Sequence, residues 1–145
     1  MKRILLALFT AAALAGMAGT ALAQDVCAPA KVTTLAAQQF FANIKLTWTA
    51  TGNDCNTGDA STYEVRISTS PITDTNWQSA SILCSGTSAT NGNVDCCLKD
   101  VIPCATTTFY FAVFLFDGAG NRSPISNVVA QSARCSGTHI IGDCP

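Results

Sequence analysis

Alternation of apolar and polar residues is the feature that most constrains the fold of this chain. Between Asn43 and Ala50 the apolar side chains Ile44, Leu46 and Trp48 are separated by polar ones. A period of two places one set on each face of an extended segment, which is typical of a half-buried strand. The same reasoning predicts strands at Thr62–Thr69, Val94–Lys99 and Phe109–Phe116, and weaker ones at Lys31–Leu35, Ser81–Cys84 and Asn127–Ser132. Seven short strands with Gly-, Asn- and Asp-rich connections predict an all-β antiparallel sandwich.

The alternation also divides the side chains of two strands between their faces. In the predicted strand Val94–Lys99, the apolar set is Val94, Cys96 and Leu98, opposite Asp95, Cys97 and Lys99. In the predicted strand Phe109–Phe116, the inward set is Phe109, Phe111, Val113 and Leu115, and the outward set is Tyr110, Ala112, Phe114 and Phe116.

The amino terminus has the pattern of a secretory signal. Lys2 and Arg3 precede an apolar run, and a small-residue exit ends at Ala23. We therefore expect a signal peptide over residues 1–23, cleaved near Ala23, a sandwich over 24–135 and a tail over 136–145. Losing Lys2 and Arg3 changes the net charge from −1 to −3, which argues against nucleic-acid binding. No later stretch of about 20 apolar residues predicts a membrane span.

Eight cysteines follow the signal, and export places them where disulfides persist. They are Cys27, Cys55, Cys84, Cys96, Cys97, Cys104, Cys135 and Cys144. Eight cysteines permit about 105 pairings, so the sequence leaves the connectivity open. Metal or haem ligation needs C-x-x-C spacings that are absent here, and we expect no metal and no cofactor.

The ordered pieces of the chain resemble a fibronectin type III domain of the bacterial extracellular kind. The pieces are Ala28-Pro-Ala30, Ile44-Lys-Leu-Thr-Trp48, Tyr63-Glu-Val-Arg-Ile67, the run from Ser68 to Thr73 with Trp77, and the run from Phe111 to Val128. The resemblance implies an immunoglobulin-like sandwich with Trp48 buried on its second strand. Three features depart from the family: Phe109 stands where a tyrosine is usual, the Pro103-Cys104-Ala105 corner is one residue longer than usual, and the cysteines are many.

The resemblance also suggests disulfide partners. It brings the amino terminus and the loop after the second strand to one pole, which favours Cys27 with Cys55. It places Cys84 and Cys96 across one connection and both Cys104 and Cys135 at the opposite pole, and leaves Cys97 and Cys144 unassigned. Because adjacent strand residues point to opposite faces, Cys96 and Cys97 are expected in different bridges.

Catalytic and metal-binding patterns are weak. The sole histidine, His139, lies in the tail, and neither G-x-S-x-G nor H-E-x-x-H occurs. We therefore predict a protein that is not an enzyme. Oxygen donors between Asn53 and Asp59 echo part of a calcium loop, but Val65 replaces the distal glutamate, so a turn tied by Cys55 is favoured.

The outward side of the Phe109–Phe116 strand is the candidate binding surface. It comprises Tyr110, Phe114, Phe116 and the neighbouring Arg66. Exposed aromatic and arginine side chains are enriched at interfaces. The alternative is that Trp77, Pro71 or the tail with Ile140 and Ile141, pinned by Cys144, covers these aromatics.

The sequence thus predicts an exported, non-catalytic β-sandwich module, secreted or periplasmic. It would present a protein- or glycan-binding surface at the bacterial envelope or exterior, and the partner is a protein or polysaccharide. The alternatives are a structural subunit of an extracellular polymer or surface complex, which implies self-association, and a glycan-binding accessory of secreted enzymes.

Overall fold

The computed structural model describes residues 25, 27–40, 43–99, 107–132 and 144. Within them lie seven strands and one 3₁₀ turn: β1 (Ala36–Phe40), β2 (Asn43–Thr49), β3 (Thr62–Ser68), η1 (Trp77–Ser79), β4 (Ser81–Thr87), β5 (Val94–Lys99), β6 (Thr108–Phe116) and β7 (Val129–Ser132). The described part of the chain is all-β, as the alternation predicted.

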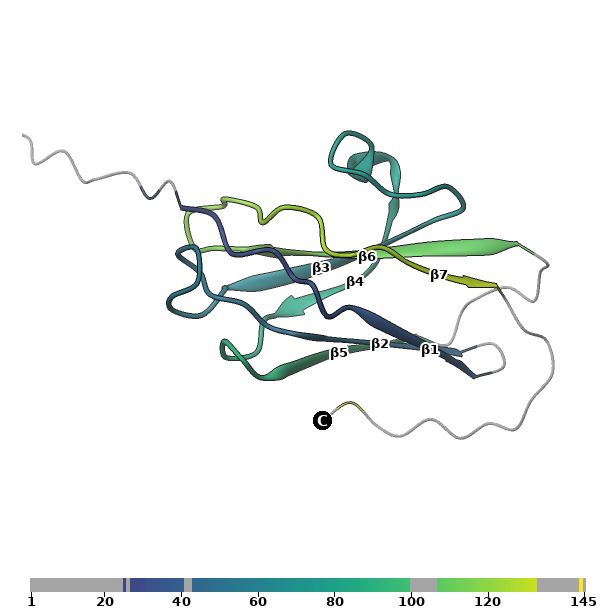
Figure 1. The fold of residues 1–145 in the computed structure, drawn as a ribbon, viewed down its shortest axis with the longest axis horizontal. Coiled ribbons are helices and arrows are strands. Elements are labelled where there is room, and N and C mark those ends of the chain that lie inside the picture. Colours follow the sequence, from purple (N-terminus) through teal and green to yellow (C-terminus); the bar gives the residue numbers. More distant parts are fainter. Residues whose placement is uncertain (1–24, 26, 41–42, 100–106, 133–143, 145) are drawn as a thin grey trace, which may run out of the picture.

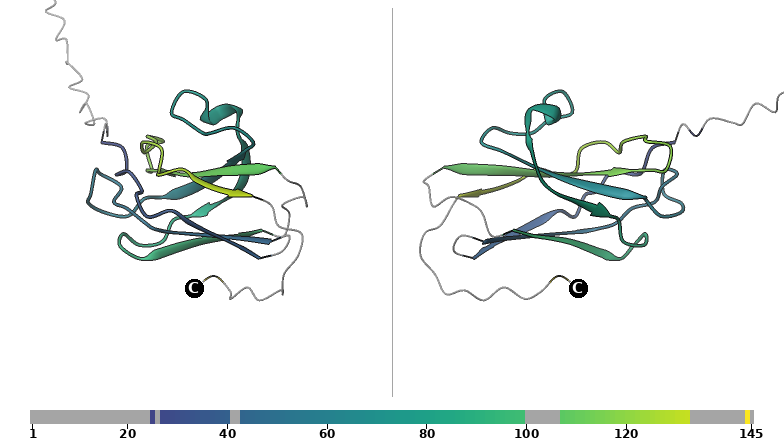
Figure 2. Two further views of the ribbon diagram at one scale, coloured as in Figure 1. Left: turned by 45° about the vertical axis from the view of Figure 1, so that its right-hand side comes forward. Right: turned by 180° about the vertical axis from the view of Figure 1, so that it is seen from behind.

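The strands form two antiparallel sheets that lie face to face (Figure 1). One sheet has the order β1-β2-β5 and the other β4-β3-β6-β7. The connection that carries η1 rises from the outer side of the four-stranded sheet, as the turned views also show (Figure 2). This order is an immunoglobulin-like sandwich stapled by disulfides, which confirms the predicted fold class.

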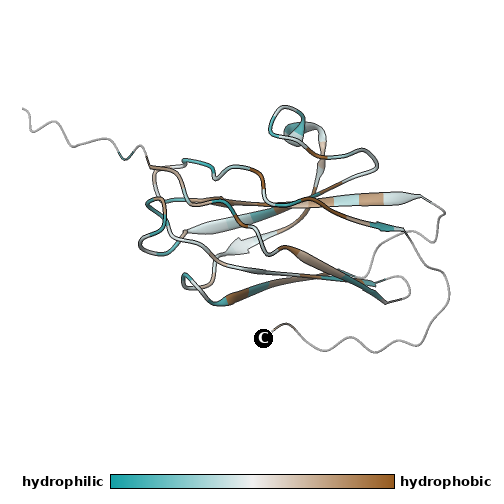
Figure 3. Cartoon of the chain, viewed as in Figure 1, coloured by the Kyte–Doolittle hydropathy of each residue, from teal (hydrophilic) through white to brown (hydrophobic). Residues whose placement is uncertain are grey.

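The core lies between the sheets, where each strand contributes its inward set. Trp48 is 1% exposed and packs edge-on against Tyr63, with 5.0 Å between the ring centroids. The fully buried members from three strands include Ile44, Leu46, Val65, Phe111, Val113 and Leu115. Brown hydrophobic and teal hydrophilic segments both occur along the strands, as expected where apolar and polar residues alternate (Figure 3). The predicted facing of β6 is confirmed, because Phe109 also packs against this core.

The predicted first strand is wrong by five residues. Residues 31–35 form no strand, and β1 begins at Ala36. The reason is a contact with the chain before β7. The Asn127 side chain accepts a hydrogen bond from the Leu35 N–H at 3.0 Å and donates to the Leu35 carbonyl at 2.8 Å. This amide takes the bonds that a neighbouring strand would otherwise offer. The other six predicted strands are present, with ends shifted by up to three residues.

A disulfide joins Cys27 to Cys55, as predicted. The amino-terminal segment runs beside the β2–β3 loop, where the Cys55 N–H donates to the Ala28 carbonyl at 3.2 Å. Glycine is needed at position 52 in this loop, because a Cβ there would lie 2.3 Å from the Asn56 carbonyl carbon. The loop folds back on itself closely enough to bring Cys55 under the amino terminus.

The predicted bridge from Cys84 to Cys96 is wrong. Cys84 is bonded to Cys97, with 6.5 Å between their Cα atoms, and Cys96 is bonded to Cys144. The two adjacent cysteines do serve different bridges, as predicted. Cys104 and Cys135 lie outside the described residues.

The physical reason is that β5 presents the opposite face from the one predicted. Cys97 lies opposite Leu46 and Asp95 opposite Trp48, so both point inward. Asp95 is 9% exposed, and it accepts hydrogen bonds from the Ser88 hydroxyl and the Ala89 N–H. These bonds offset the cost of burying a carboxylate. Val94, predicted to face inward, is 53% exposed.

The three disulfides among the described residues are typical of an extracellular or periplasmic protein. In the described part of the chain, no helix has the length and apolar character needed to cross a membrane.

Candidate functional site

The outer face of the four-stranded sheet carries the candidate site, because β6 places its aromatic side chains there. Its frame is two rows of side chains that cross β6, β3 and β4. Phe116 lies opposite Thr62, which lies opposite Thr87, and Phe114 lies opposite Glu64, which lies opposite Ser85. Directly opposed residues of antiparallel strands point to the same side. Since Val65 of β3 points into the core, both rows face outward.

The twelve-residue connection between β3 and β4 covers one end of this face. Trp77 lies 5.1 Å from Phe114, measured between ring centroids. Phe114 is therefore 0% exposed and forms a second cluster with Ile72, Ala80 and Ala112. The cluster lies outside the sheet, separate from the core between the two sheets.

Two arginines hold Trp77 in place. The guanidinium carbons of Arg66 and Arg122 lie 4.9 Å and 4.8 Å from the Trp77 ring centroid, and that of Arg122 lies 4.6 Å from the Phe114 ring. Arg66 also donates to the Glu64 carboxylate and, at 2.7 Å, to the Ala80 carbonyl. Each guanidinium thus combines ring contact with hydrogen bonds to a fixed partner.

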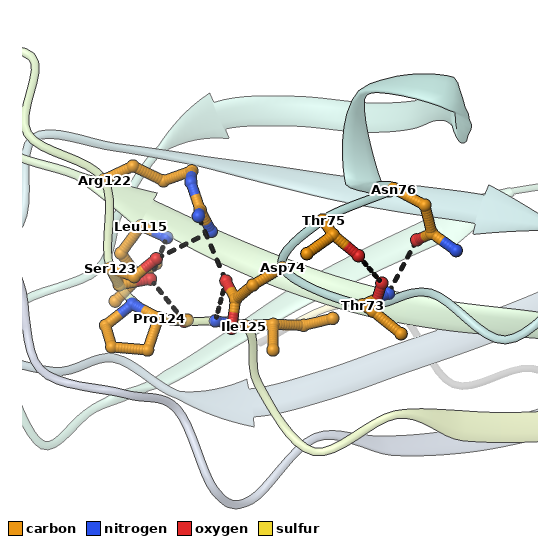
Figure 4. Close-up of polar contacts among 9 residues, drawn as sticks. All are labelled: Thr73, Asp74, Thr75, Asn76, Leu115, Arg122, Ser123, Pro124 and Ile125. Atoms are coloured by element: carbon orange, nitrogen blue, oxygen red, sulfur yellow. Dashed lines mark hydrogen bonds and ion pairs between the residues drawn. The ribbon is translucent and has the colours of Figure 1, made fainter.

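Asp74 ties the connection to the chain beyond β6. One carboxylate oxygen of Asp74 accepts from Arg122 at 3.0 Å and from the Ile125 N–H at 3.2 Å (Figure 4). The turn before Trp77 is set locally, because the Asn76 side chain accepts from the Thr73 N–H at 2.7 Å. The β3–β4 connection is therefore held to the sheet by Trp77, which packs on Phe114, and to the chain beyond β6 by Asp74.

The predicted exposure of the binding-surface residues is only partly right. Phe114 is buried, and the alternative cover by Trp77 is what the structure has. Tyr110, Phe116 and Arg66 are half-buried. Cys144 is bonded to Cys96 on β5 of the other sheet, and the tail residues Ile140 and Ile141 lie outside the described residues.

The uncovered end of the face is an open groove of about 530 Å³. Its lining residues are Thr62, Tyr63, Glu64, Ser85, Gly86, Thr87 and Phe116. Thr62, Ser85 and Thr87 are exposed, and their hydroxyls make no hydrogen bond within the part of the chain that the structure describes. Polar groups that lack protein partners are available to a ligand.

Sequence reasoning missed the hydroxyl residues of the groove, as well as Asp74 and Arg122. The hydroxyls belong to outward strand positions that look like ordinary surface. Their alignment beside Phe116 depends on the β3–β4 register, which a bulge shifts between Val65 and Arg66. Only the alternation of Thr62 and Glu64 with apolar neighbours was a usable signal.

The loop from Asn53 to Asp59, weighed as a calcium loop, lies at a pole of the sandwich. It closes as a turn in which the Asp54 and Thr57 backbones exchange two hydrogen bonds of 3.0 Å. The negative charge of Asp25 raises the pKa of Asp54, with smaller contributions from burial and from Asp117. Among the described residues, no three His, Cys, Asp or Glu side chains gather closely enough to hold a metal ion.

Asp117 organises the β6–β7 turn and yields a pH prediction. Burial alone would raise the pKa of its carboxyl, but hydrogen bonds from Asn121 and from the Ala119 and Gly120 backbone outweigh burial and lower the pKa. A lowered folded-state pKa stabilises the fold above the unfolded pKa of about 4, and this stability is lost as the pH falls through the folded value.

We expect Asp117→Asn to reduce the free energy of unfolding at pH 7 by about 1 to 2 kcal/mol. The variant amide would face the Asn121 Nδ2, which now donates to the Asp117 Oδ2 at 2.7 Å. Urea unfolding at pH 7 and at pH 2 measures the effect. The difference between the variant and the wild type should shrink at pH 2; an equal difference at both pH values would contradict the role of the carboxylate charge.

No known family model and no curated protein matches the chain. Among solved structures, the fold is similar to part of the spore cortex lytic enzyme SleM of Clostridium perfringens, at 17% identity and a TM-score of 0.50. That alignment covers 72% of this chain and 28% of the enzyme, so the chain matches less than a third of it. The sensor domain of the anti-sigma factor RsgI4 of Pseudobacteroides cellulosolvens aligns at 15% identity and a TM-score of 0.41, covering 72% of this chain and 93% of the domain. At 17% identity the likeness to SleM shows a shared fold and nothing about function.

Proposed function

We propose that this chain is an exported, non-catalytic module of the fibronectin type III kind that binds a partner at the bacterial envelope or exterior. Residues 1–23 would direct export and be removed near Ala23. The groove on the outer face of the four-stranded sheet is the binding surface in this proposal. Three disulfides and the order of the two sheets support it.

The single observation that carries the proposal is the contrast between the two ends of this face. At one end, Trp77 contacts both arginines and Phe114, so these side chains are already engaged within the protein. At the other end, three hydroxyls and the half-buried Phe116 ring surround a groove without using one another as partners. The β3–β4 connection is held in place by Trp77, and the groove beside it has hydroxyls without protein partners. Such a surface is preorganised, which lowers the entropic cost of binding.

The proposal is tested by blocking the groove. The exported protein, purified from the producing bacterium, is mixed with the envelope fraction of the same cells and sedimented. We expect the wild type to co-sediment and Ser85→Arg to lose most of this binding, because the longer charged side chain fills the groove. Thr49→Arg is the matched control, since Thr49 faces outward on the three-stranded sheet.

Retention of binding by Ser85→Arg, or absence of binding by the wild type, would contradict the proposal. Amino-terminal sequencing of the purified protein tests export at the same time. The expected first residue is Gln24 or a close neighbour. An intact Met1 would contradict the signal.

A second candidate function is a subunit of an extracellular polymer, and the β4 edge favours it. Ser81–Thr87 contains no charged residue and no proline, and Ile82 is 56% exposed. Natural edge strands are usually protected by charges, proline or bulges, and here the only such device on β4 is the bulge at Leu83. Size-exclusion chromatography tests this candidate: a monomer at high concentration would count against it, and Ile82→Lys should dissolve any assembly.

A further inference from the structure

We propose that the groove binds a neutral oligosaccharide. This inference rests on the proposed function and names the chemical class of its ligand. It is carried by three properties of the groove lining: hydroxyls without protein partners, a compensated charge and one half-buried aromatic ring.

The hydroxyls of Thr62, Thr87 and Ser85 are the first property. Each can donate one hydrogen bond and accept two. Thr62 and Thr87 are directly opposed across β3 and β4, and Ser85 follows in the next row. A sugar ring offers hydroxyls with the same dual capacity, so it can bond to all three side chains in either direction. A ligand with only acceptors, such as a phosphate, would find no cation in this lining to balance its charge.

The charge of the groove is the second property. Glu64 is the only charged residue of the lining, and one of its oxygens accepts from Arg66 at the covered end. Glu64 and Arg66 are 17% and 12% exposed, so the pair is largely removed from solvent. The pair leaves the groove without net charge, which favours a neutral ligand over an anionic or cationic one. The second carboxylate oxygen of Glu64 remains able to accept from a sugar hydroxyl.

The ring of Phe116 is the third property. It is half-buried, and it ends the row that begins with Thr87 and Thr62. The face of an aromatic ring carries partial negative charge, and the axial C–H groups of a pyranose carry partial positive charge. A sugar stacked on Phe116 would therefore have its hydroxyl edge beside Thr62.

A peptide would use a different part of this face. Peptides that bind sheets by strand addition pair with the backbone of an open edge, here β4, and draw little from side-chain hydroxyls on the face. Dependence on the Thr62 and Thr87 hydroxyls therefore separates a glycan from an added strand.

The test is titration of the isotopically labelled full mature chain with cello-, chito- and xylo-oligosaccharides and with mannose and galactose oligomers, followed by NMR. We expect at least one to bind with a Kd of about 0.1 to 1 mM, an affinity typical of few hydrogen bonds in an open site. Amide shifts should concentrate at Thr62, Glu64, Ser85, Thr87 and Phe116.

The double variant Thr62→Val with Thr87→Val should weaken this binding about tenfold, because it removes two hydroxyls. It keeps the β-branched shape that suits a strand. Thr47→Val with Thr49→Val is the matched control on the outward face of the other sheet, and its affinity should equal that of the wild type. Phe116→Ala should abolish detectable binding, with its fold checked by the same spectra.

Three outcomes would overturn the glycan inference: no oligosaccharide binds, the shifts fall elsewhere, or the threonine double variant binds as well as the wild type. A different experiment tests the proposed function, which requires only that the wild type bind the envelope fraction and that Ser85→Arg lose this binding. Loss of envelope binding by Ser85→Arg, without oligosaccharide binding, would leave the groove as the surface and reject the glycan.

Discussion

Replacing both Cys84 and Cys97 with alanine is expected to lower the free energy of unfolding by about 3 kcal/mol. The bridge closes a 13-residue separation, and loop closure of this size accounts for about that amount in the chain-entropy model. Cys97 is 3% exposed and packs in the core, so its loss also removes apolar contacts. Guanidinium chloride unfolding of the oxidised proteins measures the difference.

Two single variants distinguish the observed connectivity from a bridge between Cys84 and Cys96. In Cys96→Ala, Cys84 should stay protected from thiol reagents under denaturing conditions, and Cys144 should become reactive. In Cys97→Ala, Cys84 should become reactive instead. A reactive Cys84 in the Cys96→Ala protein, or a stability loss below about 0.5 kcal/mol in the double variant, would contradict the structural role assigned to this bridge.

Replacing Trp77 with alanine is expected to lower the free energy of unfolding by about 3 kcal/mol. About 2 kcal/mol comes from a half-buried indole whose removal exposes Phe114, and the two arginine contacts add about 0.5 kcal/mol each. The change also removes the contact of the β3–β4 connection with Phe114, whereas the bonds of Asp74 with Arg122 and the Ile125 N–H remain. Urea unfolding, monitored by far-ultraviolet circular dichroism, measures the free energy of unfolding.

Trp77→Phe is the matched control. It keeps a ring over Phe114 and between the arginines, so the loss should be about 1 kcal/mol. Asp74→Ala should cost less than Trp77→Ala, because Asp74 is half-exposed and exposed ion pairs contribute little. A Trp77→Ala protein as stable as the wild type would show that the connection is not held by this side chain.

Most of the fold could be predicted from the sequence, because period two is a local property. The inward set of β6 and the burial of Trp48 follow from alternation alone. The first strand could not be placed, because the bonds between Asn127 and Leu35 join residues 92 positions apart. The facing of β5 was equally inaccessible, since both of its alternating sets contain a cysteine and Asp95 is buried only with the help of Ser88 and Ala89.

The residues of the predicted binding surface lie on the expected outer face of β6 and β3, but the exposure of Phe114 differs from the prediction. Phe116 and Arg66 lie where the outward alternation of β6 and β3 puts them. Phe114 was expected to face solvent, and Trp77 covers it from a connection whose path depends on Asp74 and Arg122. The open hydroxyls beside Phe116 became visible only once the bulged register of β4 was known.

By itself the sequence determined the class of the fold and indicated an oxidising compartment. Alternation depends only on neighbouring residues, and the number of cysteines can be read without knowing which of them pair. Tertiary structure alone decided which cysteine meets Cys84, which aromatics stay accessible and where hydroxyls gather. Those outcomes depend on pairings between distant strands, whose register and facing are set by the packing of the whole sandwich.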